Sequence, residues 1–171
     1  ALKPYKSEGV FSDIGCYTLA ALPPYSIINS CVDMGASVTM AIGAADAGLH
    51  PSVAVIGDST FTHSGMTGLL DAVVKNSSVT IIISDNSTTG MTGGQKSHAT
   101  GRLEKICEGL GVAPEHIRSI IPLRKNHEGN VHVLREEFDY RGVSVIISAR
   151  ECIQTATRHR KEESTENKSK E

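Results

Sequence analysis

Two short apolar runs, at residues 53–56 and 79–83, constrain the fold more than any other feature of this chain. Both are rich in β-branched residues without polar alternation, which is typical of strands covered on both faces in a parallel sheet. Between them, five apolar residues recur at the spacing of one helix stripe: Met66, Leu69, Leu70, Val73 and Val74. The sequence therefore predicts a strand, a helix and a second, parallel strand, with a right-handed crossover.

The rest of the chain alternates in the same way. Strands are predicted at residues 26–32, 117–122 and 143–147, and helices at residues 36–49, around Leu103, Ile106, Cys107 and Leu110, and around Val131, Leu134 and Phe138. The pattern predicts an α/β fold, a doubly wound and mainly parallel sheet with helices on both faces. Residues 158–171 are charged and lack apolar side chains, which predicts a disordered tail after one domain of residues 1–157.

Composition excludes several functional classes. The net charge of −2 and pI near 6.4 leave no basic footprint for nucleic acid. No apolar run is long enough to span a bilayer and no signal peptide is recognisable, so we expect no membrane partner. Four widely spaced cysteines without a C-x-x-C pair favour reduced thiols in the cytoplasm. The chain starts at Ala1 without an initiator Met, and we interpret it as a piece of a longer protein.

Polar residues follow the two buried runs at the point where each strand should end. Asp58 follows the first run and Asn86 follows the second. Because parallel strands point their carboxyl ends at one edge of a sheet, both side chains should meet there. Mg²⁺ prefers hard oxygen ligands, and Asp58, Asn86 and a backbone carbonyl near Thr88 would leave room for a diphosphate.

The residues around Asp58 suit that anion. Gly57 allows close approach of the backbone, while Ser59 and Thr60 offer hydroxyl and N–H donors. A helix predicted to begin near Ser64 would direct its positive end toward the site.

Four motifs in order carry a resemblance to a known family. They are S-D-I-G-C-Y-T at residues 12–18, C-V-D-M-G-A-S at residues 31–37, G-D-S-T-F-T-H-S-G at residues 57–65 and T-G-G-Q at residues 92–95. The Gly-Asp pair, with Asn86 28 positions after Asp58, looks like the thiamine diphosphate motif. Over residues 11–150 the chain resembles the cofactor domain of the indolepyruvate ferredoxin oxidoreductase alpha subunit, of the 2-oxoacid:ferredoxin oxidoreductase family.

The resemblance implies which residues contact thiamine diphosphate. They are Gly15, Cys16, Tyr17, Gly35, Ala36, Ser37, Gly57, Asp58, Ser59, Thr60, Asn86, Thr88, Thr92, Gly93 and Gln95, with Asp58, Asn86 and Thr88 also on the metal. The glycine-rich loop of residues 86–100, predicted to be structureless, would close over the cofactor. His63 is a candidate for proton transfer near the thiazolium, and His98 is a weaker one.

Each of these residues also has a structural interpretation. Asp58 could cap the next helix, and Asn86 could be a turn residue beside a better ligand, Asp85. Cys16 could be an ordinary buried thiol, and His63 a surface group. Gly35, Ala36 and Ser37 could be no more than a helix start.

The resemblance implies oxidative decarboxylation of a 2-oxo acid of the indolepyruvate or arylpyruvate type to an acyl-CoA, with electrons passed to ferredoxin. Iron-sulfur clusters are expected only on other segments or partners. The activating glutamate comes, in relatives, from a pyrimidine-binding domain, so we expect an oligomer with its site at an interface. Two alternatives stay open: a non-oxidative decarboxylase, acting for instance on sulfopyruvate or phosphonopyruvate, and a noncatalytic cofactor-binding subunit.

Overall fold

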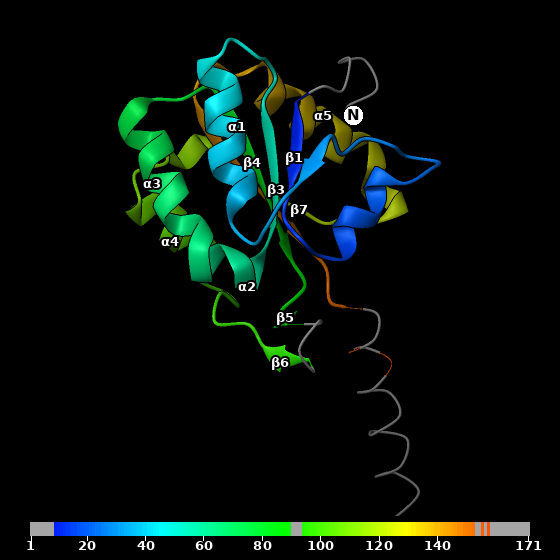
Figure 1. The fold of residues 1–171 in the computed structure, drawn as a ribbon. Coiled ribbons are helices and arrows are strands. Elements are labelled where there is room, and N and C mark those ends of the chain that lie inside the picture. The colour runs from blue at the N-terminus through cyan, green and yellow to red at the C-terminus, as the bar shows by residue number, and fades with distance from the viewer. Residues whose placement is uncertain (1–8, 90–93, 153–154, 156, 158–171) are drawn as a thin grey trace, which may run out of the picture.

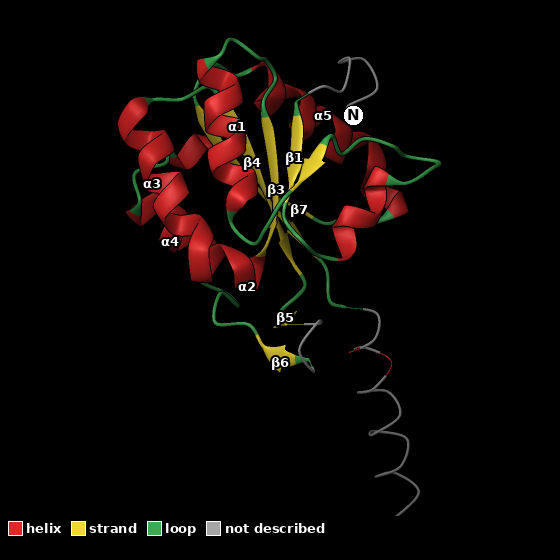
Figure 2. Cartoon of the chain, viewed as in Figure 1, coloured by secondary structure: helices red, strands yellow, loops and turns green. Residues whose placement is uncertain are grey.

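The computed structural model describes residues 9–89, 94–152, 155 and 157, and its centre is a six-stranded sheet (Figures 1 and 2). All of the pairings in this sheet are parallel, and the strand order is β2-β1-β3-β4-β8-β7. The strands are β1 (Val10–Ser12), β2 (Ser30–Cys31), β3 (Val53–Gly57), β4 (Val79–Asp85), β7 (Ile117–Ile120) and β8 (Val143–Ala149).

Helices cover both faces of the sheet, which confirms the predicted doubly wound α/β fold. The α-helices are α1 (Ala36–Asp46), α2 (Asp58–Thr60), α3 (Met66–Lys75), α4 (Leu103–Gly109) and α5 (His127–Asp139). Shorter helices are η1 (Cys16–Ala21), η2 (Phe61–Gly65), η4 (Pro114–His116) and η5 (Arg124–Asn126). In Figure 1, α1, α3 and α4 lie on one side of the sheet and α5 lies on the other.

The core divides into two layers because side chains of a strand alternate between faces. Ala54 and Ile56 of β3 pack in the larger layer with residues of α1, α3 and α4. Val53 and Val55 point to the other face, where Phe138 of α5 is buried with them. The continuous apolar run of β3 is therefore explained by burial on both faces.

The helix stripe predicted after β3 is too wide. Leu69 is fully buried, as expected, but Leu70 is 46% exposed and Val74 is 77% exposed. Because α3 lies on the outside of one face of the sheet, only part of its apolar surface can reach the core.

The predicted first strand, residues 26–32, is wrong in extent. Only Ser30–Cys31 pairs in the sheet as β2, and the first strand is β1, which the sequence pattern did not reveal. Ser26 has a left-handed φ of 46°, which an extended strand cannot contain. Ile28 packs against the layer under α5 instead.

Two predictions next to β3 and β4 are also wrong. The helix after β3 begins at Asp58, not near Ser64, and runs through α2, η2 and α3 as far as Lys75. The loop of residues 86–100 is not structureless, because Thr88–Thr89 (β5) and Gln95–Lys96 (β6) pair as a small antiparallel hairpin. The predicted tail of residues 158–171 lies outside the described residues. No helix in the described part of the chain has the length and apolarity to cross a membrane.

Candidate functional site

The carboxyl ends of the parallel strands gather most of the predicted site residues at one edge of the sheet. In the strand order of the sheet, β2 lies on one side of the neighbouring pair β1 and β3, and β4 lies on the other side. The chain therefore turns in one direction after β1 and in the opposite direction after β3. This change of direction makes the ends of β1 and β3 a topological switch point, which is where open α/β sheets bind ligands.

The strand register brings Asp58 to the residues that follow β4. Gly57 pairs with Ser84, so Asp58 is level with Asp85, and Asn86 is one residue further along. Neighbouring strands lie about 4.8 Å apart, so these side chains share one small region. The negative charge of Asp85 contributes to raising the pKa of Asp58, which agrees with that proximity.

The Asp58 carboxylate is buried and only partly satisfied. Asp58 is 3% exposed, and this burial raises the pKa of its carboxyl group above the ordinary value. Hydrogen bonds from the Ser97 side chain and the Ser59 backbone lower that pKa, but by less than burial raises it. Among the described residues Oδ2 of Asp58 has no hydrogen-bond partner. A buried carboxylate oxygen without a partner is costly, and a cation would satisfy it.

Asp85 and Asn86 each form a side-chain turn with the backbone. Oδ1 of Asp85 accepts the N–H of Ser87 at 3.0 Å, and Oδ1 of Asn86 accepts the N–H of Thr88 at 3.1 Å. These bonds orient both side chains at the end of β4. They do not distinguish between Asn86 and Asp85 as a ligand, so that alternative stays open.

The small hairpin is tied to the start of the helix that carries Asp58. The hydroxyls of Ser59 and Thr89 lie 2.9 Å apart, and the Thr88 hydroxyl donates to the Gln95 carbonyl at 3.2 Å. Ser97, which follows the hairpin, is 4% exposed and bonds to Asp58. Sequence reasoning missed Ser97 and Thr89, because a hydroxyl residue in a loop carries no spacing signal.

The local structure does not explain why residue 57 is a glycine. Its φ of −80° and ψ of 154° are open to any residue, and a Cβ there would come no closer than 3.5 Å to Tyr17, an ordinary contact. Neither backbone nor packing therefore requires glycine. Close approach of a ligand to this backbone would explain it.

The ends of β1 and β2 supply the other flank of the site. Gly15, Cys16 and Tyr17 follow β1, and residues 35–37 open α1 after β2. Asp13 was missed as a site residue, yet it is fully buried and its carboxylate bonds to the backbone of Gly35 and Ser37. A bond between residues that are 22 or more positions apart leaves no mark in the sequence pattern.

Three further predictions have a definite structural context. Cys16 is exposed, so its interpretation as a buried thiol is wrong. His63 is exposed on η2, and within the described part of the chain no hydrogen bond or ion pair joins its side chain to another residue. Thr92 and Gly93 lie outside the described residues.

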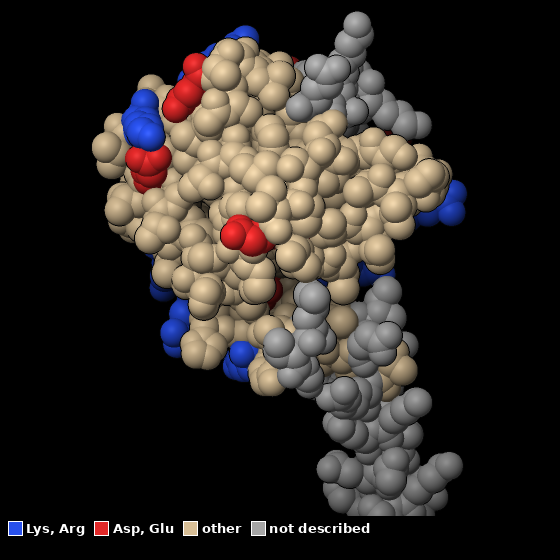
Figure 3. Space-filling model, viewed as in Figure 1, with Lys and Arg blue, Asp and Glu red and all other residues tan. Residues whose placement is uncertain are grey.

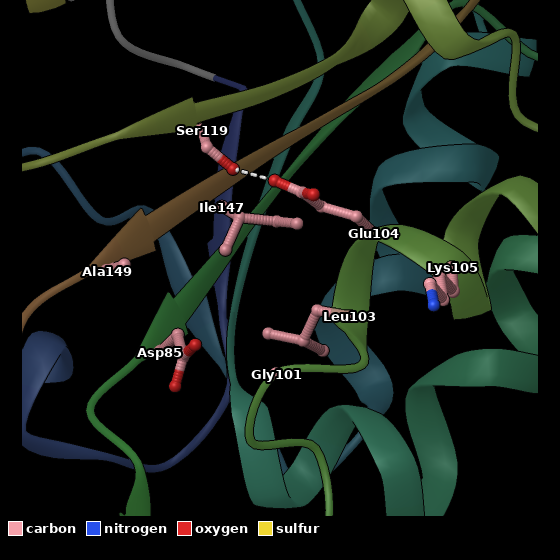
Figure 4. Close-up of a pocket in the computed structure, with 8 residues that line it drawn as sticks. All are labelled: Asp85, Gly101, Leu103, Glu104, Lys105, Ser119, Ile147 and Ala149. Carbon is pink, nitrogen blue, oxygen red and sulfur yellow. Dashed lines mark hydrogen bonds between the residues drawn. The ribbon is translucent and has the colours of Figure 1, made fainter.

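A cavity of about 250 Å³ lies beside this site, between α4 and the ends of β4, β7 and β8 (Figure 4). Asp85 lines it at the end of β4, and the Ser119 hydroxyl donates to Glu104 at 2.6 Å across it. Two carboxylates against one ammonium, Lys105, disfavour an anion here. A diphosphate therefore fits the region of Asp58 better than this cavity.

Comparison with known proteins decides the family. The family described as "Thiamine pyrophosphate enzyme, C-terminal TPP binding domain" matches residues 13–147. The chain belongs to this family. As a thiamine pyrophosphate-binding domain it has thiamine diphosphate, the same compound, as its cofactor.

The resemblance to the indolepyruvate oxidoreductase subunit is also confirmed. The subunit IorA of Archaeoglobus fulgidus is 38% identical over 89% of this chain, and that of Pyrococcus horikoshii is 32% identical over 82%. The chain spans only 26% and 25% of those proteins, about a quarter of their length.

Solved structures agree on the fold. A 2-oxoglutarate:ferredoxin oxidoreductase from Magnetococcus marinus, with 2-oxoglutarate, coenzyme A and succinyl-CoA bound, has a TM-score of 0.65 at 17% identity, covering 86% of this chain and 56% of that one. Benzoylformate decarboxylase from Polynucleobacter necessarius has a TM-score of 0.62 at 16% identity, covering 84% and 30%. At such low identity the likeness establishes the thiamine diphosphate-binding fold alone.

Proposed function

We propose that this domain anchors thiamine diphosphate through Mg²⁺ in a 2-oxoacid ferredoxin oxidoreductase of the indolepyruvate type. The observation that carries the proposal is the buried Asp58 carboxylate, whose Oδ2 has no partner among the described residues, beside the end of β4. The ion would be held by Asp58, by Asn86 and by the backbone near Thr88. The three donors would be a carboxylate oxygen, an amide oxygen and a backbone carbonyl oxygen. Only one of them belongs to a His, Cys, Asp or Glu side chain, and the described part of the chain has no group of three such residues suited to a metal.

The chain's own residues would bind and orient the diphosphate. The helix that starts at Asp58 presents backbone N–H groups of its first turn, including that of Thr60, at the same strand end, whereas the Ser59 N–H is already bonded to the Asp58 carboxylate. The hairpin of β5 and β6 is joined to this turn by the contact between the Ser59 and Thr89 hydroxyls. The cofactor, when bound, supplies an electron sink for decarboxylation of a 2-oxo acid.

We expect the complete enzyme to have a partner at the carboxyl edge of the sheet, beside the proposed cofactor site. Among the described residues, nine large apolar side chains are exposed, and six of them lie in one segment of the sequence, residues 14–34. We call these six the N-terminal apolar patch: Ile14, Leu19, Leu22, Tyr25, Val32 and Met34. Figure 3 shows few charged side chains over the part of the surface where this segment lies. Concentrated apolar exposure next to a ligand site is typical of a protein interface.

The partner that we propose is a pyrimidine-binding domain or subunit that contributes the activating glutamate. Electrons would leave through iron-sulfur clusters on other segments or subunits toward ferredoxin, and the acyl group would pass to CoA. The IorA relatives are named as subunits of an oxidoreductase, which supports an oligomer. Residues 1–157 would form the cofactor-binding unit of that assembly.

Calorimetric titration of the chain with thiamine diphosphate and Mg²⁺ tests the site. Asp58→Ala should weaken binding by roughly tenfold or more, because it removes a charged ligand of the ion. Asn86→Ala should weaken it as well, whereas Asp85→Asn, which tests the alternative ligand, should leave the affinity unchanged. If wild type and Asp58→Ala bind alike, the site is wrong. If Asp85→Asn is the damaging change and Asn86→Ala is not, Asp85 is the ligand.

A second experiment tests the reaction. The chain, mixed with its pyrimidine-binding partner, a 2-oxo acid, CoA and an oxidised viologen, should reduce the dye. Release of aldehyde without dye reduction would favour the non-oxidative decarboxylase. Cofactor binding without either reaction would favour a noncatalytic subunit.

A further inference from the structure

The loop of residues 13–17, which we call the edge loop, fastens the start of α1. Asp13 is 0% exposed, and its two carboxylate oxygens accept the backbone N–H of Gly35 and of Ser37, each at 2.8 Å. Gly35 is the N-cap residue of α1 and Ser37 lies in its first turn, where backbone N–H groups have no partner within the helix. One buried carboxylate therefore holds α1 against the end of β1.

Gly35, one of the two residues bound by Asp13, lies in a tight turn. Its φ is +99°, and a Cβ there would lie 2.4 Å from the Ser64 hydroxyl oxygen. The turn therefore passes close to the helix that begins at Asp58. Asp13 sets the path of the turn at the point where it approaches that helix.

The same loop also fastens the end of β3. The Tyr17 hydroxyl oxygen accepts the backbone N–H of Gly57, the residue before Asp58, at 2.9 Å. The Tyr17 ring can reach it because Gly15 has no side chain: a Cβ there would lie 2.4 Å from the ring. The contact crosses the switch point between β1 and β3.

The edge loop is itself held by local hydrogen bonds. The Thr18 hydroxyl donates to the Asp13 carbonyl at 2.6 Å and accepts the N–H of Gly15 at 2.9 Å. The Ser12 hydroxyl donates to the same Asp13 carbonyl at 2.8 Å. Asp13 and Tyr17 are thereby fixed relative to each other, so the two attachments form one rigid unit.

We propose that Asp13 and Tyr17 are positioning residues that hold Gly35–Ser37 and Gly57–Asp58 at a fixed spacing before the cofactor binds. The inference rests on the proposed function, because both attachments end on backbone that we assign to the cofactor site. A site ordered in advance loses less entropy on binding than one that must be assembled by the ligand. Neither side chain needs to touch the cofactor for this effect.

Amide hydrogen exchange of the ligand-free chain tests the attachments directly. Asp13→Asn should accelerate exchange at Gly35 and Ser37 by roughly tenfold, and Tyr17→Phe should do so at Gly57, while distant strands stay protected. Asp46→Asn and Tyr25→Phe are matched controls, because both positions are exposed and neither change should alter exchange at these amides.

Titration with thiamine diphosphate and Mg²⁺ then tests the role. Both variants should bind roughly tenfold more weakly than wild type. In the reconstituted enzyme they should raise the KM for the cofactor and leave kcat at saturation unchanged. Tyr17→Phe keeps the ring and its packing, so it remains informative if Asp13→Asn does not fold.

The outcomes separate this inference from the proposed function. Absence of binding by wild type overturns the proposed function and, with it, this role. Unchanged affinity in variants whose amides exchange faster, with wild type binding normally, overturns the positioning role alone. Unchanged exchange in both variants overturns the attachments themselves.

Discussion

Asp13 and Asp58 are both buried carboxylates at the same edge of the sheet, but their surroundings differ. Each oxygen of Asp13 accepts a backbone N–H, so the structure accounts for its burial. Oδ2 of Asp58 has no such partner among the described residues. Because buried polar groups in proteins are nearly always paired, the unpaired oxygen indicates a ligand at Asp58 and a structural role at Asp13.

Cys107 should be unreactive in the folded chain. It is 0% exposed, and burial, together with the charge of Glu104, raises the pKa of its thiol to about 12. The thiolate is the reactive form, and it is scarce at pH 8 when the pKa is that high. Cys16 and Cys31 are exposed, so a disulfide reagent should label them rapidly and reach Cys107 only after denaturation.

The control for this prediction compares two serine substitutions. Cys16→Ser should remove one rapidly labelled thiol, whereas Cys107→Ser should leave the rapid phase unchanged. A loss of rapid labelling in Cys107→Ser would contradict the burial of the Cys107 thiol.

How far the sequence predicts individual residues depends on how local their signal is. Asp58 and Asn86 follow the apolar runs within three residues, and the structure places each directly after its strand, β3 or β4. Asp13 acts on amides 22 and 24 residues away, so its role appears only when β1 and α1 are placed in space. Cys16 was open between two interpretations because exposure on a short helix has no sequence signature.

Packing between helices gives a prediction at the level of elements. A Cβ on Gly68 of α3 would lie 2.9 Å from a Val38 methyl of α1, so Gly68→Ala should push the two helices apart. We expect it to lower the free energy of unfolding by about 1–3 kcal/mol, measured by urea denaturation. Gly43→Ala, within α1 where a Cβ meets nothing within 4 Å, should raise it by about 0.5–1 kcal/mol. Equal effects of the two substitutions would show that α1 and α3 do not pack closely at Gly68.

The elements that the sequence predicted well are those buried on both faces. β3, β4 and β8 are long apolar runs, and each was found within two residues of its ends. β1 and β2 have only three and two residues, too few for a period to be recognised. The start of the helix at Asp58 was missed because no separate capping residue stands between it and β3.

At the level of the whole molecule, the proposed cofactor site and both ends of the N-terminal apolar patch, Ile14 and Met34, lie at the same edge of the sheet. The strand ends, the hairpin of β5 and β6, and the edge loop all lie at the carboxyl edge of the sheet. The N-terminal apolar patch begins within the edge loop, at Ile14, and continues past η1 to Met34. A partner that covers the patch would therefore also border the proposed cofactor site.

Substitution within the patch should separate assembly from folding. Leu19 is 67% exposed, so Leu19→Ser should change the free energy of unfolding by less than about 0.5 kcal/mol. It should nevertheless weaken association with the pyrimidine-binding partner by roughly tenfold, measured by surface plasmon resonance, because it removes apolar area from the interface. Val74→Ser is the matched control, since Val74 is 77% exposed on α3, outside the patch. If Val74→Ser weakens association and Leu19→Ser does not, the partner covers α3 instead of the N-terminal apolar patch, and it would approach the proposed cofactor site past the helix that follows β3.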